Sequence, residues 1–275
     1  LAETPDEKQA LLSALETHGT WLADPEHLSE GNHALHQDLG LFVLASFLRR
    51  REWQDLAVRR LAELFEGSFD ENGANDEGSV EYHRLNLAWW TSAWDRVAME
   101  DVEVPRHVQQ TLTRAADFLA HATRPDGFMM TIGDTHLKRV EASGRPEIDY
   151  VATLGDEGEP PSSTTVVAPN GFILGRSGWG GEGRSYAEET SYSLRYGPQI
   201  RSHQHEDRGG ITFFSGGRDW ITDPGSYNYE PKDPFRRHLR SRQAHNLVVV
   251  DDREYAPAGH VRLERAEVSD HAHDY

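Results

Sequence analysis

The first half of the chain repeats a pattern in which apolar residues recur every three to four positions. The stretch Glu52–Phe65 shows it most plainly, and Val80–Met99 and Val108–Ala122 repeat it. This period places the apolar side chains on one face of an α-helix. Successive amphipathic helices of this kind are typical of a bundle, a toroid or a solenoid.

The second half replaces this pattern with short β-type runs between turn residues. Strands are predicted at Thr164–Ala168, Gly171–Gly175, Ser191–Tyr196, Ile211–Phe214, Trp220–Thr222 and Asn246–Val250. The residues between Arg124 and Ser163 are rich in Gly, Pro and acidic side chains, which marks a linker or a domain boundary. Helices followed by strands, rather than alternating with them, predict an α+β fold with domains at residues 1–145 and 146–275.

Composition narrows the classes of function. The 275 residues include no cysteine, so any metal must be held by His, Asp or Glu. A formal net charge of −18 argues against nucleic acid as a partner, because binding phosphates needs a basic surface. The longest apolar run, Leu39–Leu48, falls short of the roughly 20 residues that cross a bilayer. No membrane segment is therefore expected, and this run is predicted to be a buried helix.

The two ends of the chain say little about location. The start, LAETPDEKQA, lacks the basic and apolar regions of a signal peptide. We expect both ends to be cut from a longer protein.

Three potential metal ligands lie at the edges of predicted strands. His205 precedes one strand, Asp223 follows the next, and His245 enters a third. A turn at Gly216-Gly217 would fold the first two strands together and bring His205 and Asp223 to the same end. Two histidines and a carboxylate suit Zn²⁺, with water or another group in the fourth position. The alternative is that Asp223-Pro224-Gly225 is only a turn and the histidines are surface residues.

His203 lies two residues before His205, so both side chains would share one face of an extended segment. A metal rarely needs both, so one of them is expected to bind it while the other faces a cleft, where a neutral His suits proton transfer. A hydrogen-bonded histidine at a strand end explains the spacing equally well. Asp207, in the same segment, is expected to orient a neighbouring group.

The residues from His203 to Asp251 resemble the heparinase II/III-like module of polysaccharide lyases. The resemblance is carried by an H-x-H-x-D start, a glycine hairpin, D-P-G-x-Y-x-Y, an arginine-rich segment over Arg236–Arg242, and A-H-N before a run of valines. The helical half is similar to the α/α toroid of the same enzymes, through GNHALHQDLGLFVLASFL and the E-x-S-x-x-Y-H pattern in DEGSVEYHRLNLAWW. It departs from the family at Gly78 and Val80, and in having too few helices for a complete toroid.

The resemblance implies a fold and an activity. The fold is an incomplete α/α toroid followed by an antiparallel β-sandwich, and the activity is β-elimination at uronic acids of an acidic polysaccharide. The implied residues are Asn32, His33, Tyr82 and His203 for catalysis, and His205, Asp223 and His245 for a structural Zn²⁺. Secretion or export to the periplasm is implied as well.

The chemistry of β-elimination accounts for the catalytic residue types. The proton on carbon 5 is removed only if the neighbouring carboxylate is neutralised, a role for the Asn32 amide and His203. Tyr82 suits protonation of the leaving oxygen and serves as the base in a syn course, whereas His33 suits the base in an anti course. Without the resemblance, Asn32 would be interpreted as a helix N-cap and Tyr82 as a half-buried core residue.

Substrate contacts are predicted in the second half. Arg236–Arg242 is the one dense basic stretch, and Arg240 and Arg236 are expected to bind carboxylates there. The alternative is a solvated charge run that pairs with the abundant Asp and Glu. Tyr227 and Tyr229 are the predicted sugar contacts. The spacing of Trp89, Trp90 and Trp94 is more typical of core packing than of a sugar groove.

Two other classes of function stay open from the sequence. One is a zinc-dependent glycan hydrolase, in which His205, Asp223 and His245 would activate water. The other is a non-catalytic carbohydrate-binding protein that retains the fold.

Overall fold

The computed structural model describes residues 4–181, 183–198, 203–253, 259–269 and 272–275. It divides into two compact units that interleave along the chain. The first unit comprises the residues up to Ser68 together with Ala88–Gln109, and the second comprises Phe69–Leu87 and Gln110–Tyr275. The predicted domain limits at residues 145 and 146 stay a prediction.

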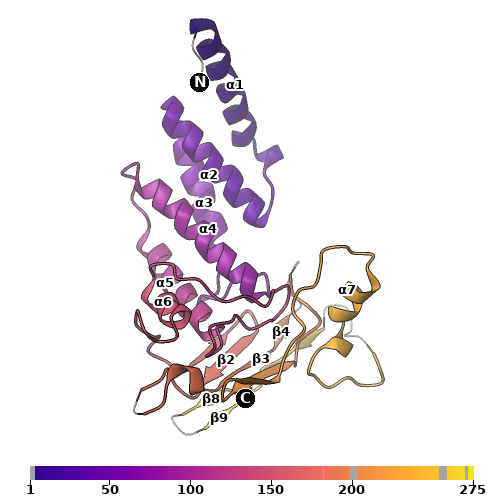
Figure 1. The fold of residues 1–275 in the computed structure, drawn as a ribbon. Helices are drawn as coiled ribbons and strands as arrows, with labels where there is room; N and C mark the ends of the chain where they lie inside the picture. Colours follow the sequence, from indigo (N-terminus) through magenta and orange to yellow (C-terminus); the bar gives the residue numbers. More distant parts are fainter. Residues whose placement is uncertain (1–3, 182, 199–202, 254–258, 270–271) are drawn as a thin grey trace. The chain divides into compact units, whose positions relative to one another are not determined.

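The first unit is helical. It contains α1 (Pro5–Ala23), the short 3₁₀ helix η1 (Pro25–His27), α2 (Gly31–Leu48), α3 (Arg51–Glu66) and the later turns of α4 (Val80–Ala98). Thr4 and Glu7 form a reciprocal capping box that starts α1. Arg49, with φ 57°, ends α2 in the left-handed region, so α3 follows after a short turn (Figure 1). The predicted helix at Glu52–Phe65 is confirmed.

Aromatic side chains form the core of this unit. The ring of Phe65 meets the rings of Trp90 and Trp94 edge-on, with centroids 5.1 and 6.2 Å apart. Both tryptophans are about 1% exposed, which confirms the core role predicted for them. Trp89 is half-buried and lies edge-on to His36.

The apolar run Leu39–Leu48 is buried on one face only. Leu41 and Phe42 are fully buried, whereas Phe47 is 65% exposed, so the prediction of a buried helix was wrong for half of its surface. A helix packed on one side against its neighbours covers only one stripe of its side chains. No helix among the described residues is both long and apolar enough to cross a membrane.

The second unit contains an antiparallel sheet. Its five strands run in the order β1-β2-β3-β5-β6, and two short pairs, β4 with β7 and β8 with β9, lie outside it. The bounds are β1 (Thr165–Ala168), β2 (Phe172–Arg176), β3 (Ser191–Arg195), β4 (Gly197–Pro198), β5 (Ile211–Ser215), β6 (Arg218–Ile221), β7 (His260–Val261), β8 (Glu267–Val268) and β9 (His273–Asp274). The helices are α5 (Arg106–His121), α6 (Pro146–Ala152), α7 (Pro234–Leu239) and the 3₁₀ turns η2 (Tyr186–Glu188) and η3 (Arg242–Ala244).

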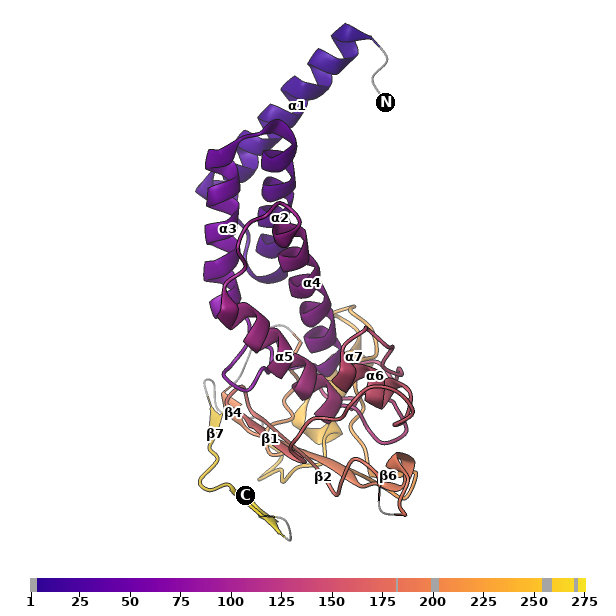
Figure 2. The same cartoon turned by 90° about the vertical axis from the view of Figure 1, so that its left-hand side faces the viewer.

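Helix α5 covers one side of strands β1 and β2 (Figure 2). Phe118 on α5 packs edge-on against Phe172 on β2, with ring centroids 5.2 Å apart. Arg176, at the end of β2, is buried and donates to the carbonyls of Ala120 and Thr123. Its positive charge thus satisfies the last carbonyls of α5, where the helix dipole is negative.

The hairpin of β5 and β6 has the predicted glycine turn. Gly216 and Gly217 have φ of 58° and 75°, the positive values that a tight type I′ hairpin turn needs. Ser215 pairs with Arg218 across the turn, and the register shifts between Phe213 and Phe214. Five of the six predicted strands are confirmed by the sheet.

The sixth predicted strand, Asn246–Val250, is wrong. These residues form no strand, and Val248 is 81% exposed. Asn246 instead ties the two hairpin strands together, because its carbonyl accepts from Ile211 N and its amide donates to Thr222 O. The Arg242 guanidinium donates a hydrogen bond to the carbonyl of Val248. This carbonyl is therefore satisfied by a side chain rather than by the backbone of a neighbouring strand.

We predict that replacing Asp117 of α5 by Asn stabilises the protein near neutral pH. Burial and the charge of Glu147 on α6 raise the pKa of Asp117 from 3.8 to about 6. The folded carboxyl therefore holds its proton where the unfolded one has lost it, and stability falls as pH rises through this window. Asp117→Asn should raise the free energy of unfolding by about 1–2 kcal/mol near pH 7 and leave it unchanged near pH 4.

Denaturant unfolding at both pH values measures this difference. Asp95→Asn on the exposed face of α4 is the matched control and should change stability at neither pH. Equal stability of Asp117→Asn and the wild type near pH 7 would contradict the electrostatic origin.

Candidate functional site

Three segments distant in sequence approach one another at backbone level around Gly133. A β-carbon added to Gly133, which has φ 61°, would lie 2.6 Å from the carbonyl of Gly78 and 2.7 Å from that of His203. Only glycine fits this approach. The next amide, of Asp134, donates to His203 O at 2.9 Å. Gly78, a departure from the family pattern, packs directly against Gln204.

The three predicted metal ligands converge. One ligand atom from each of His205, Asp223 and His245 lies within 4.8 Å of the others, and all three residues are buried. His205 precedes β5 and Asp223 follows β6, so the hairpin brings them together as predicted, while His245 comes after η3. This group is a possible metal site.

The donor atoms of this group fit a metal ion. His205 Nδ1 and His245 Nε2 are buried and make no hydrogen bond with any described residue. His245 Nδ1 lies 2.7 Å from Asp223 Oδ2. Burial lowers the pKa of His245, but the Asp223 carboxylate outweighs it and raises this pKa. Two imidazoles and one carboxylate with unsatisfied buried nitrogens are the donor set of an N/O metal site.

His203, Tyr82 and Tyr229 form an aromatic cluster beside the possible metal site. The rings of Tyr82 and His203 are stacked, with centroids 3.3 Å apart and planes 11° apart. The hydroxyls of Tyr82 and Tyr229 are 3.2 Å apart. Burial and this hydrogen bond raise the pKa of Tyr229. The structure thus brings together two of the predicted catalytic residues and one predicted substrate contact.

Helix α4 positions Tyr82. The Ser79 hydroxyl accepts from Tyr82 N at 3.4 Å and lies 3.0 Å from the hydroxyl of Thr135. Tyr82 therefore stands on the first turn of a capped helix, which accounts for the serine of the E-x-S-x-x-Y-H pattern. His83 faces the other way: it is buried, accepts from Asn75 N and lies 2.8 Å from Ala115 O, and burial lowers its pKa to about 4.

Two carboxylates flank the His203 ring. Its Nδ1 lies 3.1 Å from Asp134 Oδ2, and its Nε2 lies 3.5 Å from Glu77 Oε2. Glu77 is held in turn by the side-chain amide of Asn86. Each ring nitrogen thus has an acceptor within reach.

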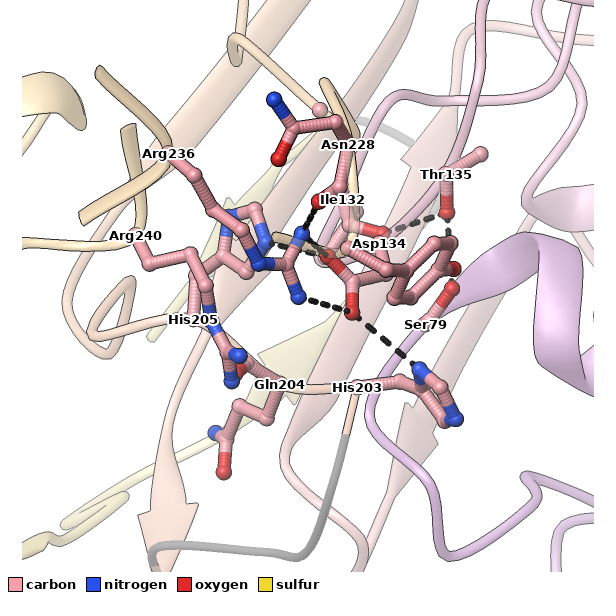
Figure 3. A network of polar contacts seen from close by, with 12 residues as sticks. Ser79, Ile132, Asp134, Thr135, His203, Gln204, His205, Asn228, Arg236 and Arg240 are labelled. Atoms are coloured by element: carbon pink, nitrogen blue, oxygen red, sulfur yellow. Dashed lines mark hydrogen bonds and ion pairs between the residues drawn. The ribbon is translucent and has the colours of Figure 1, made fainter. Parts of the chain in front are cut away.

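Asp134 is the residue that sequence reasoning missed. Its carboxylate contacts His203, His205 and Arg236 at once (Figure 3). Burial raises its pKa, but the hydrogen bonds from both histidines and the charge of Arg236 outweigh this and hold the pKa of Asp134 far below its usual range. The residue falls in the stretch interpreted as a linker, where only the Gly133-Asp134 pair could have pointed to it.

The predicted arginine and tyrosine contacts differ in their surroundings. Arg236 is buried, binds Asp134 and the carbonyl of Asn228, and lies 4.8 Å from the centre of the Tyr229 ring. Arg240 is half-buried and donates to Gln204 O at 2.9 Å. Tyr227 is 51% exposed and meets Phe235 edge-on. Their roles toward a substrate stay predictions.

Asn32 and His33 belong to the helical unit, whereas the other predicted site residues belong to the second unit. Helix α2 begins at Gly31 with Glu30 in the N-cap position, so Asn32 lies inside the helix and the N-cap interpretation was wrong. His33 is exposed on the same turn. That these two residues face Tyr82 and His203 stays a prediction.

Asp207 contacts a buried arginine. It is fully buried, and its Oδ2 lies 3.4 Å from Arg195 Nε. Burial raises the pKa of Asp207. The guanidinium of Arg195 also lies over the Phe172 ring. That Asp207 orients a neighbouring group stays a prediction.

Family models match both halves of the chain. Residues 3–151 match the model described as heparinase II/III N-terminus, and residues 176–273 match heparinase II/III-like, C-terminal. The chain belongs to the heparinase II/III family.

Curated relatives of this heparinase II/III chain are lyases. A heparin-sulfate lyase of Pedobacter heparinus is 24% identical over 250 residues, which cover 82% of this chain and 37% of the relative. A heparin-sulfate lyase of Bacteroides stercoris is 23% identical over 249 residues, covering 82% and 36%. The chain thus spans little more than a third of the length of these relatives.

Solved structures share the fold. A crystal structure of a heparan sulfate lyase from Pedobacter heparinus has a TM-score of 0.79 at 21% identity, over 97% of this chain and 44% of that one. A heparinase III has a TM-score of 0.77 at 21% identity, over 93% and 42%. The predicted fold class, part of an α/α toroid followed by an antiparallel β-sandwich module, is confirmed.

We predict that metal removal destabilises the chain through His205, Asp223 and His245. A ligand bound to the folded state alone stabilises it by about 3–4 kcal/mol at 100 to 1,000 times its dissociation constant. A chelator should therefore lower the melting temperature of the wild type, and added metal should restore it. The His245→Ala variant should have a lower melting temperature than the wild type, and the chelator should not lower it further.

Thermal unfolding by circular dichroism with and without chelator measures this effect. His107→Ala at an exposed position of α5 is the control and should respond as the wild type does. A wild type indifferent to chelation would count against a bound metal.

Proposed function

We propose that this chain is the lyase part of a polysaccharide lyase that cleaves a uronic-acid-containing polysaccharide by β-elimination. The single observation that carries the proposal is the stack of Tyr82 on His203, which lies beside a buried His/Asp/His group in a member of this family. Since the named relatives are heparin-sulfate lyases, a heparin-like or heparan-like chain is the first substrate to test.

The reaction begins with neutralisation of the substrate carboxylate. Negative charge builds on this group as the carbon 5 proton leaves, and fixed hydrogen-bond donors aimed at it lower the barrier. His203 suits this role, because Asp134 fixes its ring through Nδ1 at 3.1 Å, and Nε2, 3.5 Å from Glu77, is the nitrogen that would donate to the substrate. The Asn32 amide is the second donor on this proposal.

Tyr82 suits the transfer of a proton to the leaving oxygen. The hydroxyls of Tyr82 and Tyr229 are 3.2 Å apart, so the Tyr229 hydroxyl can donate to the Tyr82 oxygen once Tyr82 has lost its proton. This hydrogen bond stabilises the Tyr82 phenolate that forms when Tyr82 gives up its proton. Tyr82 also serves as the base in a syn course, whereas His33 is the base in an anti course.

Zn²⁺ is the metal that suits His205, Asp223 and His245, and we infer that its role is structural. It would cross-link the entrance of β5, the end of β6 and the residue after η3. A bound ion would supply a positive charge near His203 and would fix the segment that carries it. In this proposal, amino-acid side chains carry out every proton transfer.

An acidic polysaccharide must approach a protein of net charge −18. The segment Arg236–Arg242 is the local source of positive charge, with Arg240 as the carboxylate contact and Tyr227 and Tyr229 as sugar contacts. Arg236, the other predicted carboxylate contact, is buried against Asp134. Tyr227 and Tyr229 are about half exposed, which leaves their rings open to a sugar. A secreted or periplasmic location is part of the same proposal.

The test is release of unsaturated uronic acid, followed by ultraviolet absorbance. Wild-type protein is incubated with heparin, heparan sulfate, alginate, hyaluronan and chondroitin sulfate. Tyr82→Phe should lower the rate by about 10²-fold or more, because the phenolic proton is removed, while substrate binding is retained. Tyr196→Phe, at a tyrosine bonded to Ala168 O, is the control and should keep the activity.

Other outcomes separate the alternatives. Cleavage without the absorbing double bond would indicate a glycan hydrolase, and binding without cleavage would indicate a carbohydrate-binding protein. Either result, or no cleavage of any of the five polymers, would contradict the proposed lyase activity.

A further inference from the structure

The contacts of Asp134 are divided between two histidines. Its Oδ1 lies 3.1 Å from His205 Nε2, and its Oδ2 lies 3.1 Å from His203 Nδ1 (Figure 3). Its backbone amide donates to His203 O as well. One residue therefore holds the H-x-H segment at three points.

These contacts select the protonated nitrogen of each ring. A carboxylate only accepts hydrogen bonds, so His205 must carry its proton on Nε2 and His203 must carry one on Nδ1. The lone pair of His205 is then on Nδ1. That nitrogen is the one that is buried and makes no hydrogen bond with any described residue.

We propose that Asp134 is a positioning residue that orients the metal ligand His205 and the catalytic histidine His203 at the same time. The half that concerns His203 rests on the proposed function, and the half that concerns His205 rests on the metal group alone. A carboxylate behind a metal-bound imidazole fixes the ring and raises the basicity of the ligand. Here the second oxygen of that carboxylate holds the catalytic ring.

Arg236 is the counter-charge rather than the main partner. Its guanidinium nitrogens lie 3.4 and 3.5 Å from the two oxygens of Asp134, farther than the two imidazole nitrogens. The Asp134 side chain is 0% exposed, and a lone buried carboxylate would be strongly unfavourable. Arg236 offsets that charge without taking either oxygen away from its histidine.

The spacing of the H-x-H motif follows from this arrangement. Residues two apart in an extended segment share a face, so both rings can reach one carboxylate. Gln204 between them points elsewhere (Figure 3). The two imidazoles of the motif thus each hydrogen-bond one carboxylate oxygen of Asp134, which lies about 70 positions earlier in the chain.

Asp134→Asn is the test variant. The amide keeps the size of the side chain but replaces one acceptor oxygen by a donor, so it cannot accept from both histidines. In a titration of metal-free protein with Zn²⁺ against a chromogenic chelator, we expect zinc affinity to fall about 10–100-fold. On the lyase substrate, kcat should fall about 10-fold or more, with KM nearly unchanged because Asp134 does not touch the sugar.

Asp156→Asn is the matched control at an exposed position and should bind zinc and turn over as the wild type does. Unchanged zinc affinity in a folded Asp134→Asn protein would overturn the proposal. A loss of affinity together with a raised KM and an unchanged kcat would overturn the part that concerns His203. A wild type without lyase activity would reject the proposed function, and zinc affinity would still decide the part that concerns His205.

A measurement on the wild type guards against a variant that fails to fold. Long-range ¹H–¹⁵N spectra of the zinc-loaded protein report which nitrogen of each histidine carries a proton, and His205→Gln assigns the signal. We expect the His205 proton on Nε2 and the metal on Nδ1. Metal on Nε2 would leave Asp134 without this hydrogen bond and would exclude the positioning role.

Discussion

A buried negative charge organises the second unit. The carboxylate of Asp134 is removed from water, and a charge in that position is tolerated only when donors surround it. Two imidazoles and a guanidinium do so, and they come from segments on either side of the β5–β6 hairpin. The aromatic stack and the possible metal site are both attached to these donors, so the two features share a single electrostatic centre.

The fold supplies this centre through backbone contacts rather than through regular elements alone. Because Gly133 has no side chain, its backbone packs directly against the carbonyls of Gly78, before α4, and His203, before β5. The glycine turn then sets the end of β6 beside the entrance of β5. Each functional side chain therefore begins from a backbone position that neighbouring carbonyls and amides already fix.

Sequence patterns predicted the features of the fold that depend on interactions between residues close in sequence. The 3.6-residue period gave the helices, and the glycine turn between alternating runs gave the hairpin and so the approach of His205 and Asp223. Asp134 escaped because its partners lie 69 to 102 positions away, and no periodicity records a contact of that range. The Asn246–Val250 run failed for a related reason: its apolar residues have strand propensity, yet pairing depends on a neighbour that sequence pattern alone does not specify.

The close approach at Gly133 also bears on how this protein can change. A position packed against two carbonyls admits no side chain, so it is closed to variation even though it carries no chemistry. The edge-on pair of Tyr227 and Phe235 is the opposite case, since both side chains are about half exposed to solvent. Substitutions are therefore expected to be tolerated more readily at such exposed aromatics than at Gly133.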